Sequence, residues 1–258
     1  MKKHITVCAA LGLLYATSGF GAESAAAPPV DTRYSNEWEF SVTPYLWAPA
    51  LSGTIAHRRL PVVDISASFD KILDNLDFAA MLMADARKGR YSIFGDLIYV
   101  KVGAQGDTKR EILATSADVK NESFAGFLGG GYSVLENSPH RLEVVGGLRV
   151  WSVDTDITFK GPLGAGRKHS DNATWVDALV GVRGNYAFSS KAYLTGWGLI
   201  GAGGADAEWD LGLGVGYHFS KTISGTIGYR AIGVDYDHNG FKYDAVLQGP
   251  MAGLTIRF

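Results

Sequence analysis

Apolar residues alternate with small or polar residues along most of the chain from residue 38 to its end. The clearest example has apolar side chains at every second position, with glycines and polar residues between them: Trp209, Leu211, Leu213, Val215, Tyr217 and Phe219. Side chains on a β-strand point alternately to its two faces, so this pattern predicts two-faced strands. It predicts ten of them, at residues 38–50, 78–87, 91–102, 118–135, 141–159, 174–188, 192–203, 208–219, 223–236 and 241–258.

The connections between these strands alternate in length. Every second connection is a short turn, whereas the three long connections all lie at the other end, at 51–77, 103–117 and 160–173. Short turns at one end and long loops at the other are typical of a transmembrane β-barrel. We therefore predict an all-β, antiparallel barrel of about ten strands with both termini on the periplasmic, short-turn side. A hairpin within 51–67 would make twelve strands, and merging weak segments would make eight.

The N-terminal residues do not follow the strand pattern. Residues 1–22 combine a basic start, a short apolar run and small residues, as in a secretory signal peptide. Residues 23–37 are rich in Ala and Pro, which is typical of a flexible spacer. The barrel domain is then expected to occupy residues 38–258.

Residues 68–77 have the periodicity of a helix rather than a strand. Four apolar side chains share one helical face: Phe69, Ile72, Leu73 and Leu76. We expect a short helix in the first outer loop. It either lies on the rim of the barrel or folds into the mouth as a gate.

Ionisable residues gather on the strand face opposite the apolar one. They are Glu39, Asp85, Arg87, Asp96, Glu143, Arg149, Asp177, Arg183, Asp210, His218, Arg230 and Arg257. A water-soluble barrel would bury all of these in its core at high cost, whereas a membrane barrel turns them to its lumen. Two interpretations remain: a cross-linked polar lumen that keeps the barrel rigid, or the lining of a selective channel. Inward aromatic residues at Tyr45, Trp47, Phe127 and Trp151 would keep any pore narrow.

Composition and motifs argue against several other functions. A formal net charge of −2 gives no basic surplus for a nucleic-acid partner. The only cysteine, Cys8, lies in the leader, so the mature chain has no disulfide. Gly196-x-Gly198-x-x-Gly201 is followed by a strand, not by the helix that a dinucleotide site needs. A calcium-like stretch at 235–240 has Val246 where the bidentate Glu belongs. We expect neither cofactor nor metal.

A catalytic site is not expected either. His218-Phe219-Ser220 has the His-x-Ser spacing of a lipid A deacylase family, and the two side chains would share a strand face. Such a site also needs an orienting carboxylate, and none can be placed beside this pair, which lies at a short turn. The sequence therefore predicts a protein that is not an enzyme.

The final strand, 249–258, ends in phenylalanine with apolar residues at alternate positions: Leu254, Ile256 and Phe258. This resembles the C-terminal signature of Gram-negative outer-membrane β-barrels, which the barrel assembly machinery reads. The first strand, with Pro44-Tyr45-Leu46-Trp47, is similar to first strands in a group of small outer-membrane barrels. The resemblance implies a location in the cell outer membrane, with membrane lipid, lipopolysaccharide and the assembly machinery as partners. It implies no subfamily and no oligomeric state.

These observations predict a non-enzymatic outer-membrane barrel that is either structural or a narrow passive channel for small solutes. One alternative is a surface adhesion or ligand-binding protein that acts through the long loops. The other, less favoured, is an outer-membrane lipid hydrolase.

Overall fold

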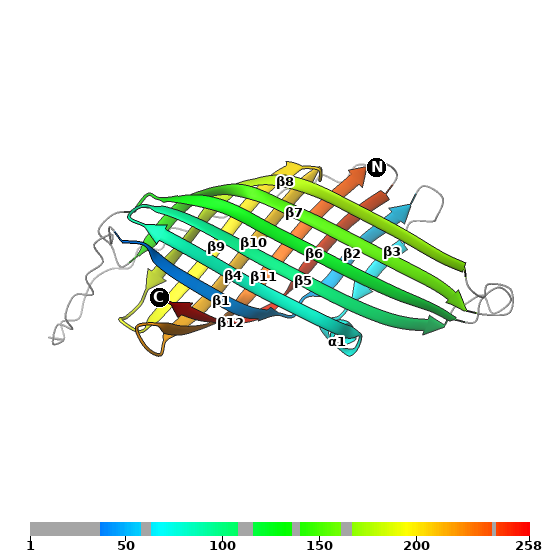
Figure 1. Ribbon diagram of the computed structural model, residues 1–258, viewed down its shortest axis with the longest axis horizontal. Coiled ribbons are helices and arrows are strands. Elements are labelled where there is room, and N and C mark those ends of the chain that lie inside the picture. Colours follow the sequence, from blue (N-terminus) through cyan, green and yellow to red (C-terminus); the bar gives the residue numbers. More distant parts are fainter. Residues whose placement is uncertain (1–36, 58–62, 108–115, 136–139, 161–166, 239–240) are drawn as a thin grey trace, which may run out of the picture.

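The computed structural model describes residues 37–57, 63–107, 116–135, 140–160, 167–238 and 241–258. Ten strands form a closed antiparallel barrel (Figure 1): β1 (Glu39–Trp47), β4 (Leu76–Lys88), β5 (Tyr91–Asp107), β6 (Ser116–Ser133), β7 (Arg141–Lys160), β8 (Arg167–Ala187), β9 (Ala192–Gly203), β10 (Ala207–His218), β11 (Ile223–His238) and β12 (Phe241–Arg257). Neighbours in this order pair with each other, and β1 closes the barrel by pairing with β12 from Ser41↔Arg257 to Trp47↔Met251. The predicted fold class and the ten barrel strands are confirmed.

The two ends of the barrel differ. The turn end carries the short turns after β4, β6, β8 and β10, the start of β1 and the C-terminus. The loop end carries the remaining connections. Strands β5 to β8 extend furthest toward the loop end, as Figure 1 shows.

A hairpin of two extra strands, β2 (Ala50–His57) and β3 (Val63–Ala67), follows β1. β2 continues along β12 where β1 stops, pairing with it from Gln248↔Ala50 to Phe241↔His57. Two successive N-terminal segments therefore share one edge of β12. The hairpin predicted as an alternative within 51–67 exists, but it lies against the loop half of the barrel and leaves the barrel itself with ten strands.

Alternate side chains along a strand point to the outer surface and to the interior of the barrel. Along β10, Leu211, Leu213, Val215 and Tyr217 are exposed on the outer surface, whereas the glycines between them are buried. Exposed aromatic residues lie on the outer surface near the turn end: Phe40, Tyr91, Tyr132, Tyr186, Tyr217, Phe219 and Phe258. An apolar outer face with aromatic residues at its border is what a lipid bilayer requires of a barrel.

The glycines on the inner face of β10 make room for rings from β9. A Cβ atom added at Gly212 would come within 2.3 Å of the Trp197 ring, and one at Gly216 within 2.0 Å of the Tyr193 ring. Both rings therefore lie directly against the β10 backbone. Gly196 to Gly201 lies inside β9 itself, away from any strand-to-helix turn.

The helix α1 (Phe69–Asp74) is shorter than the predicted 68–77, because Leu76 is the first residue of β4. None of its residues is buried, and Leu73 is 52% exposed. The helix lies beside the barrel toward the loop end (Figure 1). Within the described residues, no helix is long and apolar enough to cross a membrane.

Candidate functional site in the barrel lumen

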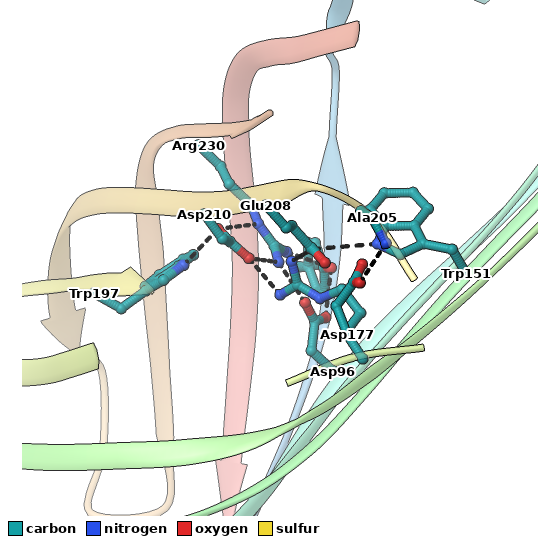
Figure 2. A network of polar contacts seen from close by, with 10 residues as sticks. Asp96, Trp151, Asp177, Trp197, Ala205, Glu208, Asp210 and Arg230 are labelled. Atoms are coloured by element: carbon teal, nitrogen blue, oxygen red, sulfur yellow. Dashed lines mark hydrogen bonds and ion pairs between the residues drawn. The ribbon is translucent and has the colours of Figure 1, made fainter. Parts of the chain in front are cut away.

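A layer of buried charges crosses the lumen. We call it the ionic layer, and it consists of Asp96, Arg149, Asp177, Glu208, Asp210 and Arg230, which come from five strands. Arg230 of β11 lies at its centre with 1% exposure and donates to Asp96 of β5 and Asp210 of β10, at 2.6 and 2.7 Å. Figure 2 shows how these side chains converge. The layer links strands on different sides of the barrel.

Arg149 of β7 provides the second cation of the ionic layer. It donates to Glu208 Oε1 and to Asp210 Oδ2, both at 2.6 Å. Asp210 also accepts the Trp197 indole N–H at 2.8 Å, so two guanidinium groups and an indole all converge on one carboxylate (Figure 2). Charge-assisted hydrogen bonds of this kind are the strong ones, and buried charges need them.

The ionic layer contains four acids and two arginines. Asp177 accepts the Ala205 backbone N–H at 2.8 Å through Oδ1, and its carboxyl group lies close to that of Glu208. Across the described part of the chain, Asp177 Oδ2 and Glu208 Oε2 have no hydrogen-bond donor. The acid excess is therefore concentrated at this pair.

The loop half of the lumen is filled with side chains. Eleven buried residues form this plug: Tyr45, Trp47, Ile98, Ala125, Trp151, Val153, Trp175, Ala205, Ile232, Val234 and Ala245. The Trp151 and Trp175 rings stack with centroids 5.9 Å apart, and Trp175 stacks on Tyr236 at 4.5 Å. Each plug residue is at most 8% exposed, so side chains of the wall occupy this half of the barrel.

The turn half holds a cavity of about 630 Å³, which we call the cup. Its floor includes Arg149, Asp210 and Arg230 of the ionic layer. The cup lies between this floor and the turn end, where Glu39, Lys221 and Phe258 line it.

One wall of the cup carries a second cluster of ion pairs. Arg183 contacts Asp85 at 2.6 Å and Glu143 at 2.5 Å, and its guanidinium lies 3.9 Å above the centre of the Phe94 ring. Arg87 also pairs with Asp85. The cations on this side therefore have carboxylate partners on β4 and β7.

The opposite wall carries hydroxyl groups. Thr43 and Thr255 are hydrogen-bonded at 2.9 Å, and the Tyr193 hydroxyl contacts Thr226 at 3.0 Å. Arg257 lies on the same side, with its guanidinium 3.5 Å from His218 Nδ1.

The structure distributes the predicted lumen charges over three levels. Five belong to the ionic layer: Asp96, Arg149, Asp177, Asp210 and Arg230. Four belong to the second cluster: Asp85, Arg87, Glu143 and Arg183. The other three lie near the turn end: Glu39, His218 and Arg257. Sequence reasoning missed Glu208, although it is two residues before Asp210 and so shares its strand face.

The predicted C-terminal signal residues lie on the outer face of β12. Leu254, Ile256 and Phe258 are 43%, 37% and 70% exposed. The backbone of Phe258 exchanges two hydrogen bonds with Phe40, at 3.0 and 3.1 Å, so the chain end lies in the seam that closes the barrel.

The His218-x-Ser220 pair is not assembled for catalysis in the described contacts. Ser220 Oγ accepts the backbone N–H groups of Thr222 and Ile223 in the turn, at 3.3 and 3.0 Å. The His218 ring instead stacks on Tyr193, with centroids 4.7 Å apart. No group of three or more His, Cys, Asp or Glu that could hold a metal ion is found among the described residues.

Comparison with known proteins identifies the fold. The sequence matches no protein-family profile and no curated protein. Among solved structures, the outer-membrane protease OmpT of Escherichia coli superposes with a TM-score of 0.52 at 11% identity, over 87% of this chain and 98% of that one. The translocator domain of NalP from Neisseria meningitidis gives 0.45 at 16% identity over 89% and 91% of the chains. Ail of Yersinia pestis gives 0.36 at 9% identity over 86% and 98%. The chain has the fold of Gram-negative outer-membrane β-barrels, which supports an outer-membrane location.

Proposed function

We propose that this protein is a non-enzymatic, structural barrel of the outer membrane whose lumen does not conduct solutes. The observation that carries the proposal is the pair of obstructions in the lumen, the plug and the ionic layer. Ion pairs join β7 to β10 and β5 to β11 across the interior. A solute would have to separate buried charges, and leaving one such charge without its partner costs about 3–5 kcal/mol. Of a structural barrel and a narrow passive channel, this packing supports the first.

Single-channel recording tests the closed lumen. The refolded protein in a planar bilayer should give no discrete conductance steps, because the plug and the ionic layer occupy the lumen. Folding is checked on the same sample by strand-type circular dichroism and by the migration difference between heated and unheated protein in detergent gels. Reproducible steps from protein that passes both checks would refute the closed barrel.

A second role at the loop end is favoured by the length of three strands. β6, β7 and β8 contain 18, 20 and 21 residues, whereas about 9–11 residues cross a membrane. At about 3.4 Å per residue and a tilt of about 40°, twenty residues rise about 50 Å, twice the apolar band of about 25 Å. With the turn end in the periplasm, this wall would stand above the cell surface and could bind an external partner.

Shortening this wall separates surface binding from a purely structural role. In β7 and β8, Asp154 pairs with Asn172, so an Asn-Gly turn in place of residues 155–171 continues the register. We expect the shortened barrel to fold, because in the proposed orientation the removed pairs would lie beyond the apolar band. Attachment of cells that display it to glycan and matrix-protein surfaces should fall to background. Attachment equal to that of cells with the full-length protein would exclude this wall as the binding surface.

A further inference from the structure

We propose that the cup is a binding site for a small organic carboxylate that enters from the turn end. Such a site does not depend on whether the barrel conducts, because the cup lies on the turn side of the ionic layer. Its volume of about 630 Å³ lies within the range of about 300–1,000 Å³ that is usual for small-molecule sites.

The charge of the cup favours an anion. The ionisable side chains of its lining comprise seven cations and five acids: Arg87, Arg141, Arg149, Arg183, Lys221, Arg230 and Arg257 against Glu39, Asp85, Asp96, Glu143 and Asp210. Every one of these acids except Glu39 is ion-paired to a lining arginine. Within the described residues, neither Arg257 nor Lys221 forms an ion pair. Both lie at the mouth, where Glu39 and the C-terminal residue Phe258 also line the cup.

Arg257 is placed to hold a carboxylate with help from its neighbours. It follows Thr255 by two residues on the inward face of β12, and Ser41 lies opposite it on β1. A planar guanidinium can hold both oxygens of a carboxylate at once, and nearby hydroxyl groups can donate to the same oxygens. The contact of Arg257 with His218 adds no negative charge that would compete with a ligand.

The interior of the cup can accommodate the apolar or aromatic part of a ligand. Phe94 and Phe127 lie with ring centroids 5.3 Å apart, and Val145 and Leu199 pack beside them in the apolar part of the lining. A carboxylate held at the mouth by Arg257 would therefore place its apolar part toward Phe127. Apolar walls with a few convergent polar groups are the usual composition of a small-molecule site.

Three ligands of the same shape and different charge test the proposal on the unmodified protein. The full barrel in lipid nanodiscs, labelled with ¹⁵N-tryptophan, is titrated with benzoate, benzamide and benzylammonium. The reporter is the indole N–H of Trp197, which lines the cup and donates to Asp210. We expect a saturable shift with benzoate, affinity about tenfold weaker with benzamide, and no saturable shift with benzylammonium. Equal affinity for benzoate and benzamide, or no saturation by benzoate, would overturn the proposal.

Two variants locate the anion within the cup. Arg257→Gln should weaken benzoate about tenfold, whereas Arg90→Gln, at the same end but outside the cup lining, should leave it unchanged. Because Arg257 lies in the closing strand, Lys221→Gln in the β10–β11 turn provides a second variant that leaves every strand intact. We expect it to weaken benzoate about threefold. Wild-type affinity in Lys221→Gln, together with wild-type affinity or misfolding of Arg257→Gln, would place the anion elsewhere.

Discussion

Replacing Arg230 by methionine is expected to lower the free energy of unfolding by about 3–5 kcal/mol. Methionine keeps an unbranched apolar stem but removes the guanidinium that donates to Asp96, Asp210 and Tyr45. Four carboxylates would then remain in the ionic layer with Arg149 as its one cation. Urea unfolding of the barrel in lipid vesicles, followed by tryptophan fluorescence, measures the loss.

Glu208→Gln is the matched variant in the same layer, and we expect it to cost nothing. The carboxamide oxygen can still accept from Arg149 and Trp151, as Glu208 Oε1 does now. Its NH₂ group would give Asp177 Oδ2 a donor and remove one of the four acids, so stability should stay equal or rise by about 1 kcal/mol. A loss in Glu208→Gln as large as that in Arg230→Met would show that the acids, and not the arginines, limit the layer.

Leu213→Arg is expected to destabilise the barrel by about 2–4 kcal/mol, because it places a cation on the lipid face near the bilayer midplane. Leu213 is 58% exposed on the outer surface, in the middle of β10 between Trp209 and the aromatic border at Tyr217. The same unfolding experiment in vesicles measures the effect, and reduced assembly in cells should accompany it.

Thr195→Arg controls for the introduction of an arginine as such. Thr195 lies on the neighbouring strand β9, opposite Gly214, and lines the cup. An arginine there can extend into the cavity toward the turn end, so we expect a loss below about 1 kcal/mol. Equal losses at positions 195 and 213 would mean that the inner and outer faces are assigned wrongly.

The barrel strands could be predicted because lipid and lumen impose opposite demands on alternate residues. Where both faces of a segment are polar, the bounds of the strands could not be predicted. The structure starts β8 at Arg167, seven residues before the predicted 174, and extends β5 to Asp107 instead of 102. Residues 167–173 are largely polar or charged on both faces, so nothing in the local pattern distinguishes a strand there from a loop. Pairing with β7 keeps the segment extended.

The predicted helix failed at its end for a similar reason. Leu76 continues the helical spacing of the apolar residues at 69–73. The same residue is also the first inward-facing position of strand β4, so an apolar side chain there fits a helix and a strand equally well. Asn75 ends the helix, and its side chain donates to the Lys71 carbonyl at 2.7 Å. The strand pairing of β4 with β5 then includes Leu76, opposite Val102.

Partners across the lumen could not be predicted from alternation. The alternation of side chains places Arg149 and Asp210 inside the barrel. The tilt and stagger of the strands decide which inward residues lie at the same height along the barrel axis. Arg149 and Glu208 are 59 residues apart in the chain and meet because the stagger of the four strands from β7 to β10 brings them to one level. The same geometry makes part of the ionic layer the floor of the cup.

The rings of Tyr193 and Trp197 lie against the β10 glycines and so limit the order in which substitutions on β9 and β10 can accumulate. Gly212 or Gly216 can acquire a methyl group only if the opposing ring moves out of the way, since an added Cβ would lie within 2.3 Å of the Trp197 ring or 2.0 Å of the Tyr193 ring. A substitution on β9 can come first. A smaller residue at position 193 or 197 enlarges the interior, and the glycine that faces it can then be replaced by a larger residue. Descendants of this barrel can therefore acquire a wider lumen through a single substitution on β9, whereas a new side chain on β10 must come second.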